Sequence, residues 1–404
     1  MPINSQPIRI ALCTQAAPWE GQPRSGLYNL RLAAALCDGG HRCDIFALTM
    51  KGPRFLERWV PKLAEFNARP DEYVYEGVRF HTIRGYLPHP NAVRWKIAPR
   101  FPAIAGGIFR RAFARGLESA LRRSSPDVVL FHDGVSLGRL GLAVHRSLSV
   151  PWGIIEQDAL ELDPNTPIGR EYARTLSSTR AVWYLAERYA AHARIRLGLT
   201  QAGVMFNGTL FPTPKQCMTG RPDRWKGKKI TLCVGTYVPR KGHDVLVRAF
   251  AKSSGPDHLL LIVGNPPPPA LSSLVRELGI GDRVEFLDYM RQEELPQYMV
   301  WADLFALTSW DEPFGMVYVE ALAAETPVIM CADCGLVSQI EPGRHGWIVP
   351  VRDVEATVAA LREAFAPGTD LRAMGRMGKA LVEKKFTWES SARQILEAIN
   401  PARA

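Results

Sequence analysis

The sequence predicts an α/β protein made of two doubly wound domains, each with a parallel sheet. Its 404 residues are too many for one ordinary core and suit two α/β domains of about 200 residues each. Short apolar runs of strand type alternate with helical stretches along the chain, which favours parallel sheets with crossover helices. The alternation stops in a segment rich in proline and turn residues near 208–228 and then starts again. We therefore expect a domain boundary in that segment.

The first half supplies the elements of one sheet. A helix ends at Gly39, because glycine favours the end of a helix. A less regular insert, rich in proline, arginine and aromatic residues, is expected between residues 52 and 101. The strands are expected at 8–13, 42–48, 127–131 and 152–156, with the helix at 27–37.

The second half restarts the same pattern. A helix that begins at about Met316 ends before Pro327, since proline cannot continue a helix. The strands are expected at 230–235, 259–264, 284–287, 303–309 and 328–331, and the helices at 243–253, 271–278 and 316–325.

Composition indicates a globular protein with anionic partners. The chain is 47% hydrophobic and 22% charged, and no apolar run reaches the roughly 20 residues that a spanning helix needs. The N-terminus lacks the layout of a signal peptide and the seven cysteines are scattered, so a cytoplasmic location is expected. The net charge of +10 favours nucleoside diphosphates or an anionic membrane surface. Nucleic acid is the least supported partner, because no basic, aromatic-rich recognition module is present.

The strongest functional signal is the run Glu312-Pro-Phe-Gly315, followed by Glu320 in an otherwise apolar helix. An apolar strand precedes the run, so both carboxylates are expected near the carboxyl edge of a parallel sheet. A carboxylate in an apolar helix needs a partner, because an unpaired buried charge costs several kcal/mol or more by rough estimate. Either the partners are backbone amides, arginine or lysine, or the carboxylates and helix amides bind a polyhydroxylated, phosphorylated ligand.

This segment resembles the nucleotide-sugar signature of retaining glycosyltransferases of family 4, which have the GT-B fold of two Rossmann-like domains facing across a cleft. The family's Glu-Pro-Phe-Gly, second Glu eight positions later, Ala and Pro-Val are present at 312–315, 320–321 and 327–328. The terminal Phe386-Thr-Trp388 is also similar to the family. The resemblance implies an acceptor-side domain at 1–207, a linker at 208–228, a nucleotide-sugar-binding domain at 229–385, and a helix at 386–404 that packs back on the first domain.

A second signal is the turn from Gly235 to Gly242, which follows a strand and opens a helix. Backbone amides at such a turn favour an anion, and Arg240 and Lys241 add positive charge. The turn resembles the family's Gly-Arg-x-x-x-x-Lys-Gly, whose arginine and lysine hold the donor diphosphate. Lys241 matches that lysine, whereas Thr236 stands in place of the arginine and Arg240 is a candidate replacement. A solvated basic turn is the alternative.

The resemblance implies roles for these residues in a donor site. Glu320 would bind the ribose hydroxyls, and Glu312 would hold the donor sugar. Lys241 and Arg240 would stabilise the charge that grows on the departing diphosphate. The other donor contacts would be Gly26, Gly235, Gly264, Tyr289, Phe314, Gly315 and Met316, the last three through backbone amides. Tyr289 has packing as its alternative role.

In the first domain, His132 follows the strand at 127–131. It matches the family's histidine near the reacting sugar and is therefore a catalytic candidate, with a structurally satisfied histidine as the alternative. Gln157 stands where many members have a histidine, so any acid–base role must lie elsewhere. Glu156 and Asp158 beside it are acceptor-site candidates.

The first domain also carries basic segments. Residues 107–123 form an amphipathic, arginine-rich helix, and the insert holds the basic, aromatic runs 93–96 and 100–101. Such a helix either packs on its own sheet or contacts an anionic membrane surface.

Together these features predict a retaining hexosyltransferase that moves a sugar from a nucleoside diphosphate to a hydroxyl of a glycan, lipid-linked or small-molecule acceptor. No metal is expected, since the chain has no Asp-x-Asp pair and fixed cations can stabilise the leaving group. The family resemblance implies front-face attack, with a phosphate oxygen of the leaving group taking the acceptor proton. The alternatives are a glycosidase that uses Glu312 and Glu320, a nucleotide-sugar epimerase or pseudo-sugar-coupling enzyme, and a non-catalytic regulator that binds nucleotide sugars.

Overall fold

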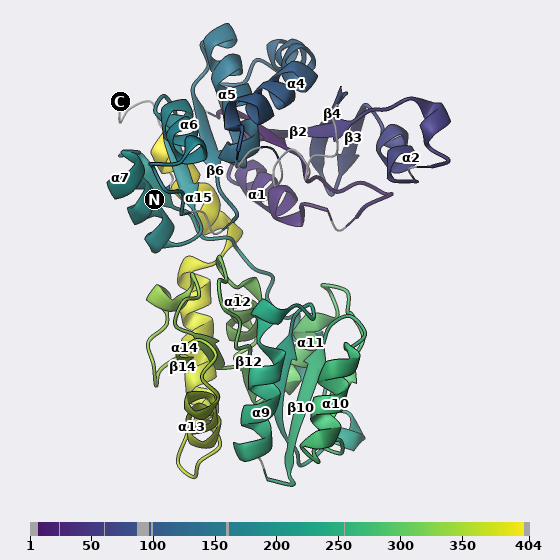
Figure 1. The fold of residues 1–404 in the computed structure, drawn as a ribbon, viewed down its shortest axis with the longest axis vertical. Helices are drawn as coiled ribbons and strands as arrows, with labels where there is room; N and C mark the ends of the chain where they lie inside the picture. The colour runs from purple at the N-terminus through teal and green to yellow at the C-terminus, as the bar shows by residue number, and fades with distance from the viewer. Residues whose placement is uncertain are drawn as a thin grey trace. The chain divides into compact units, whose positions relative to one another are not determined.

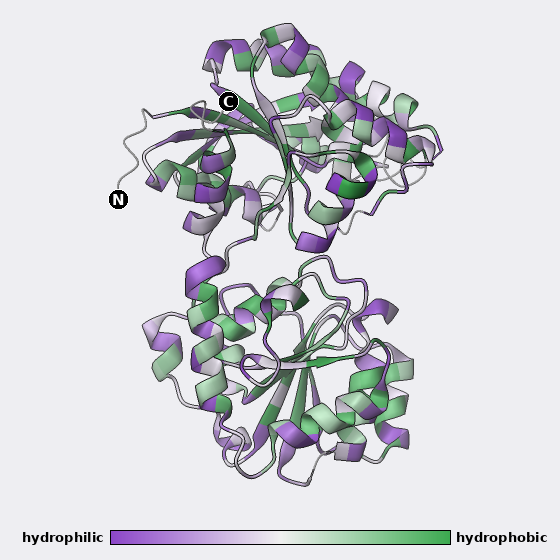
Figure 2. Cartoon of the chain, turned by 90° about the vertical axis from the view of Figure 1, so that its left-hand side faces the viewer, coloured by the Kyte–Doolittle hydropathy of each residue, from purple (hydrophilic) through white to green (hydrophobic). Residues whose placement is uncertain are grey.

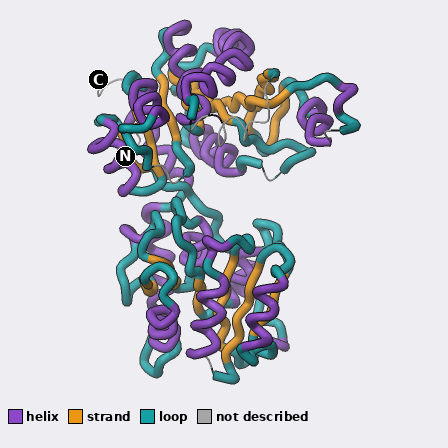
Figure 3. Tube along the Cα trace, in the orientation of Figure 1, coloured by secondary structure: helices purple, strands orange, loops and turns teal. Residues whose placement is uncertain are grey.

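The computed structural model describes residues 7–23, 25–59, 61–86, 97, 100–158, 161–253 and 255–399. The chain divides into two compact units, which we call the first unit (residues 1–208 and 388–404) and the second unit (residues 209–387). Each unit is a sheet flanked by helices (Figures 1 and 3). The predicted fold class of two Rossmann-like α/β domains is thereby confirmed.

The first unit contains an eight-stranded sheet in the order β3-β4-β2-β1-β5-β6-β7-β8. Neighbouring strands are parallel, apart from the antiparallel pair β3 and β4. The strands are β1 (Arg9–Thr14), β2 (Arg42–Met50), β3 (Glu72–Tyr75), β4 (Val78–Gly85), β5 (Val128–His132), β6 (Trp152–Ile155), β7 (Ala181–Tyr184) and β8 (Ala202–Val204).

Helices cover both faces of this sheet, because alternate residues of each strand point to opposite faces. Ile10 and Leu12 of β1 lie in one core with α1 and α15, whereas Ala11 and Cys13 lie in the other core with α4 to α7. The helices are α1 (Leu27–Asp38), α2 (Pro61–Ala68), α4 (Pro102–Ser124), α5 (Gly134–Leu148), α6 (Pro167–Leu176), α7 (Glu187–Leu197) and α15 (Trp388–Ile399), with a 3-10 turn η1 (Arg54–Leu56).

Part of the segment expected to be an irregular insert is regular structure. Strands β3 and β4 form a hairpin whose turn residues Glu76 and Gly77 have φ angles of 45° and 80°. Strand β4 then pairs in parallel with β2, so the hairpin extends the main sheet. The alternation in Glu72-Tyr-Val-Tyr75 and the Glu-Gly turn were the sequence signals for this hairpin. The basic run 93–96 lies outside the described residues.

The arginine-rich helix α4 packs its apolar side within the first unit. Phe109, Phe113 and Leu117 are fully buried against the sheet and its helices, while Arg110 and Arg115 are exposed. Packing on its own sheet, one of the two roles expected of this segment, is therefore present. Within the described residues, no helix combines the length and apolar character that a membrane span requires.

The second unit contains a six-stranded, fully parallel sheet in the order β11-β10-β9-β12-β13-β14. Its hydrophobic residues concentrate along the strands, with polar residues towards the outside (Figure 2). The strands are β9 (Lys229–Val234), β10 (His258–Val263), β11 (Val284–Leu287), β12 (Leu304–Ala306), β13 (Val328–Cys331) and β14 (Gly346–Val349). The helices are α8 (Pro214–Met218), α9 (His243–Ser253), α10 (Pro269–Glu277), α11 (Leu295–Trp301), α12 (Met316–Ala323), α13 (Val354–Ala364) and α14 (Leu371–Lys385), with 3-10 turns η3 (Asp223–Trp225), η4 (Pro239–Lys241) and η5 (Val337–Gln339).

The segment from 209 to 228 is anchored to the second unit. Trp225 is buried, and its indole N–H donates to Glu285 at 2.9 Å. The indole N–H of Trp301 donates to the carbonyl of Thr219 at 2.9 Å. The chain returns to the first unit at residue 388, where α15 buries Ala392 and Ile395 in the core beside α1.

Candidate functional site

The loop between β12 and α12 holds Glu312 in a buried position. The Ser309 hydroxyl donates to its carboxylate at 3.0 Å, and the amide of Gly335 donates to its backbone carbonyl at 2.9 Å. The loop ends at Gly315, whose φ is 89° and whose added Cβ would lie 2.5 Å from the Tyr318 ring. Only glycine fits that conformation and that space. Helix α12 then begins without a side-chain cap or an acidic residue in its first turn. Its first amides are thus available to an anion.

The turn from Gly235 to Gly242 and the loop that carries Glu312, predicted as separate signals, meet at Glu312. The Lys241 Nζ lies 2.5 Å from the Glu312 carboxylate, and an Arg240 guanidinium nitrogen lies 3.5 Å from it. The Lys241 side chain is 14% exposed and that of Arg240 is 45% exposed. Lys241 is therefore a fixed, largely desolvated cation and not part of a solvated basic turn, whereas Arg240 stays at the surface.

Backbone contacts fix the turn and the loop together. Gly242 has a φ of 65°, and an added Cβ would lie 2.2 Å from the carbonyl oxygen of Thr308. The Thr308 hydroxyl donates to the Gly242 carbonyl at 2.7 Å, and the Trp310 amide donates to the Arg240 carbonyl at 2.8 Å. The backbone positions of Lys241 and of the loop that carries Glu312 are consequently fixed relative to each other.

Glu320 lies one turn into α12 and is partly buried. Within the described residues, its carboxylate forms no hydrogen bond and no ion pair with protein. Burial raises the pKa of Glu320 to about 7. Among the described residues, Glu320 therefore has none of the backbone-amide, arginine or lysine partners that were expected for it. A carboxylate left without protein partners in an apolar helix is instead available to a ligand.

The other predicted donor residues lie at the strand ends of the same sheet. Gly235 and Gly264 follow β9 and β10, and an added Cβ on Gly264 would lie 2.6 Å from the Gly235 carbonyl oxygen. Phe314 is buried, with its ring 5.8 Å from that of Phe386, so only its backbone can serve a ligand. Tyr289 follows β11 and is 58% exposed, which places it on the surface.

His243 was missed from the sequence, although it directly follows Lys241-Gly242 at the start of α9. It is buried, its ring centroid lies 4.9 Å from that of Tyr237, and its Nε2 has no hydrogen-bond partner within the described chain. Burial, helped by the nearby charge of Lys241, lowers the pKa of His243 to about 4. The imidazole is therefore neutral, and it lies beside Gly235 and Tyr237 of the turn 235–242. A histidine at a helix start next to a Lys-Gly turn was the available signal.

In the first unit, Gly26 and His132 lie at the carboxyl ends of β1 and β5. Gly26 has a φ of 63° and starts α1, and an added Cβ would lie 2.0 Å from the Ala16 carbonyl oxygen. His132 is buried beside the Tyr28 ring, at 5.3 Å between centroids. Neither of its ring nitrogens has a hydrogen-bond partner in the described structure, and burial lowers the pKa of His132 to about 3. A structurally satisfied histidine would have such a partner.

Glu156 is a buried support for the turn that follows His132. Its carboxylate accepts a hydrogen bond from the Gly134 amide at 2.8 Å and another from the Tyr172 hydroxyl at 2.7 Å. These contacts hold the start of α5, so in this structure Glu156 faces the interior and not an acceptor. Asp158 is half-buried two residues further on. Gln157, in the family's histidine place, pairs with Asn207 at 2.8 Å and 3.3 Å.

The chain is similar to known glycosyltransferases in sequence. Residues 221–381 match the family described as Glycosyl transferases group 1. The D-inositol 3-phosphate glycosyltransferase of Nocardia farcinica is 36% identical over 424 aligned positions, covering 99% of this chain and 91% of that protein. Mannosylfructose-phosphate synthase of Agrobacterium fabrum is 32% identical over 182 residues, which span 42% of this chain and 40% of that protein.

Solved structures share the fold over nearly the whole chain. Sucrose-phosphate synthase from Thermosynechococcus elongatus has a TM-score of 0.71 at 21% identity, covering 96% of this chain and 98% of that one. The Anabaena protein Alr3699/HepE in complex with UDP has a TM-score of 0.70 at 15% identity, covering 97% and 99%. At these identities the likeness shows a common fold.

Proposed function

Since the chain belongs to the glycosyl transferases group 1 family and is a glycosyltransferase, we propose that it moves a hexose from a nucleoside diphosphate sugar to a hydroxyl group with retention of configuration. The observation that carries the proposal is the ion pair of Lys241 with Glu312 at the carboxyl edge of the second sheet. It places a fixed cation, a carboxylate and the start of α12 within one small region. These are the groups that a diphosphate and a sugar require.

Each group has a distinct part in the proposed donor site. Glu320 accepts hydrogen bonds from the ribose hydroxyls, which supply the partners that the described protein residues do not. Glu312 accepts a hydrogen bond from a hydroxyl of the donor sugar. The amides at the start of α12 donate hydrogen bonds to the same sugar. The Glu312 carboxylate is engaged by Lys241 and by the Ser309 hydroxyl, which suits it to hold a ligand and not to act as the general acid of a glycosidase.

Charge stabilisation is the main catalytic contribution that we propose for the protein. As the sugar–phosphate bond breaks, negative charge grows on the diphosphate, and Lys241 and Arg240 stabilise that charge. Because Lys241 is already held by Glu312, little reorganisation accompanies the reaction. The acceptor attacks on the same face, and its proton goes to an oxygen of the departing phosphate.

The acceptor proposed for this reaction is a polyhydroxylated compound. The relative from Nocardia farcinica is named for inositol 3-phosphate, which supports that class here. His132, with two ring nitrogens that lack protein partners among the described residues, is the proposed hydrogen-bonding group on the first unit.

Product formation from a panel of labelled nucleoside diphosphate sugars tests the function. A thermal-shift screen with the free nucleoside diphosphates first identifies the base, since a ligand at 100 times its Kd stabilises by about 2.7 kcal/mol. Transfer of label to an added polyol or sugar supports the proposal. Binding without transfer or hydrolysis would indicate a regulator, and interconversion of the free sugar nucleotide would indicate an epimerase.

We expect the transfer rate to be unchanged by EDTA. The charge on the leaving diphosphate is met by Lys241, Arg240 and helix amides, so no divalent cation is needed for that purpose. Initial rates with and without an excess of EDTA are compared at equal ionic strength. A rate that falls with chelator and returns with Mg²⁺ or Mn²⁺ would contradict the metal-free mechanism.

We also propose a reversible contact between α4 and an anionic membrane surface. Arg110, Arg111 and Arg115 are exposed on α4 and are worth about 1 kcal/mol each near such a surface. Replacing all three by glutamine should weaken sedimentation with anionic vesicles about 100-fold at low salt, whereas Arg196→Gln on α7 should not. If the wild-type chain fails to sediment with these vesicles even at low salt, the contact does not exist.

A further inference from the structure

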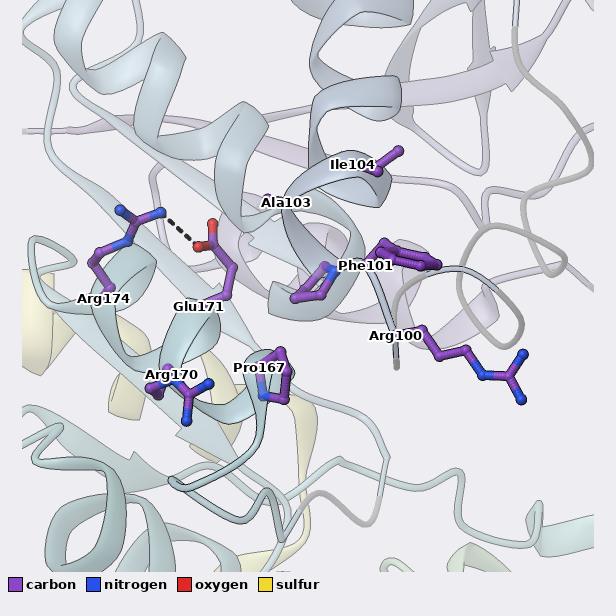
Figure 4. Close-up of a pocket in the computed structure, with 9 residues that line it drawn as sticks. Arg100, Phe101, Ala103, Ile104, Pro167, Arg170, Glu171 and Arg174 are labelled. Carbon is purple, nitrogen blue, oxygen red and sulfur yellow. Dashed lines mark hydrogen bonds and ion pairs between the residues drawn. The ribbon is translucent and has the colours of Figure 1, made fainter.

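A cavity of about 440 Å³ lies in the first unit, between the start of α4 and the first turns of α6 (Figure 4). Such a volume is typical of sites for small molecules. Arg170 and Arg174 of α6 line it on one side, and Arg100 stands at its rim, where the chain enters α4. In Figure 4 the Arg100 side chain extends outwards, on the other side of Phe101 from Glu171.

The cavity carries positive charge that the protein does not neutralise. Glu171 is the acidic residue of its lining, and Arg174, at 2.6 Å, and Arg139 already pair with it. Within the described residues, neither Arg100 nor Arg170 has a carboxylate at ion-pair distance. The Arg170 guanidinium donates to the Asn165 carbonyl at 2.5 Å, which holds it at the mouth of the cavity. Arg170 is thus available to an anion at the mouth of the cavity, and Arg100 adds positive charge at the rim.

The start of α4 adds a second attraction for an anion at the same place. This helix has 23 residues, begins with Pro102, and has neither a side-chain cap nor an acidic residue in its first turn. Ala103 and Ile104, whose amides are among its first, line the cavity. By contrast, the start of α6 is capped, because the Thr166 hydroxyl accepts from the Gly169 amide at 3.2 Å. Free amides and the helix dipole favour negative charge at the α4 end.

A narrower pocket adjoins this cavity and reaches the residues after His132. It shares Pro102 and Glu171 with the cavity and extends to Gly134 and Val135 at the start of α5. Gly134 is held by Glu156, as described above. The cavity is therefore next to the part of the first unit where the proposed function places the acceptor.

We infer that this cavity binds a phosphoryl group carried by the acceptor. A phosphoryl group has two negative charges near neutral pH and several oxygens, which match the Arg170 guanidinium and a free helix start, with the positive charge of Arg100 at the rim. Phe101 and Ile104 are 57% and 56% exposed at the mouth and would contact the carbon skeleton beyond the phosphate. The inference rests on the proposed function, because it assigns part of the acceptor for that reaction. The phosphoryl group belongs either to a soluble sugar phosphate or to a lipid headgroup.

Calorimetric titration of the full chain with glucose 6-phosphate tests the soluble source. Arg170→Gln should weaken binding at least tenfold, and Ile104→Glu, which puts a carboxylate at the mouth, should do so as well. Arg196→Gln and Ile195→Glu, at exposed positions on α7, are the matched controls and should stay within twofold. All four side chains are exposed, so the variants should fold, and circular dichroism checks that they do.

Sedimentation with vesicles of phosphatidic acid in phosphatidylcholine tests the lipid source. Loss of sedimentation in Arg170→Gln, with Arg196→Gln unaffected, would place a lipid phosphate in the cavity. If Arg170→Gln and Ile104→Glu change neither glucose 6-phosphate binding nor sedimentation, the inference is overturned. It is also overturned if Lys241→Ala alone abolishes glucose 6-phosphate binding, because the phosphate then binds only at the second unit.

Nucleoside diphosphate binding, measured in the same variants, separates this inference from the proposed function. Arg170→Gln should keep the thermal shift given by the best nucleoside diphosphate, since the donor site lies in the second unit. A wild-type chain that binds glucose 6-phosphate through Arg170 but neither binds nor uses nucleotide sugars would refute the function and leave the cavity assignment intact.

Discussion

Replacing Lys241 by methionine should lower kcat about 100- to 1,000-fold, which is the usual effect of removing one fixed group that stabilises developing charge. Methionine keeps the length of the side chain and removes the cation that lies 2.5 Å from Glu312. Arg240→Met should cost less, because Arg240 is at the surface and 3.5 Å from the same carboxylate. Single-turnover rates at saturating donor measure both effects.

The matched control for this prediction is Lys252→Met. Lys252 lies in the neighbouring helix α9 and pairs with Glu355 on the surface, so its loss should leave kcat within twofold. Circular dichroism and urea unfolding verify that the Lys241 variant, which leaves Glu312 less well paired, is still folded. If Arg240→Met proves the more damaging change, the two residues exchange roles.

Glu320→Gln should stabilise the ligand-free protein above pH 7 and weaken nucleotide binding. The pKa of Glu320 is about 7 in the fold and 4.5 as a reference, so the fold disfavours the ionised form. The protein therefore loses stability as the pH rises from about 4.5 to 7, by up to about 3 kcal/mol above pH 7. Glutamine cannot ionise and removes this loss, but it also removes the charged acceptor for the ribose hydroxyls. We expect binding about 10- to 100-fold weaker, from the loss of a charge-assisted hydrogen bond.

Urea unfolding at pH 5 and pH 8, with nucleoside diphosphate titration at pH 8, measures the two opposite effects. The control is Glu325→Gln, just beyond the end of α12, where the carboxylate pairs with Lys379 at the surface and should show neither effect. A folded Glu320→Gln variant with unchanged nucleotide affinity would remove the ribose role. Equal stability of the wild type and variant at pH 8 would contradict the burial of the charge.

The second unit was largely predictable from the sequence, because each local signal agrees with the tertiary arrangement. The strands before Gly235, Gly264 and Glu312 are nearly continuous apolar runs, as expected for parallel strands buried on both faces. The Glu312–Glu320 signature and the turn from Gly235 to Gly242 could also be located. Their meeting at Glu312 could not be derived, since it depends on the pairing of β9 with β12, which are far apart in sequence.

The first unit was less predictable because its decisive contacts are tertiary. Glu156 follows a strand in the place expected for an acceptor contact, but the Tyr172 hydroxyl and the Gly134 amide turn its carboxylate inwards. The basic residues of the cavity come from the segment before α4, at Arg100, and from α6, at Arg170, and no local pattern joins them. The hairpin of β3 and β4 was not predicted, because the prolines and arginines on either side of it indicated an irregular segment.

The return of α15 to the first unit has a consequence for synthesis on the ribosome. When the first 208 residues have emerged, the core face of α1 still lacks Ala392, Ile395 and Ile399, because 179 residues of the second unit, from 209 to 387, must be translated first. During that interval the nascent first unit presents an uncovered apolar face next to Leu30 and Leu36. At about 5–20 residues per second, the interval lasts on the order of 10–40 seconds, long enough for a chaperone to bind. The order of the two units along the messenger RNA thus makes the last helix the one that completes the first domain.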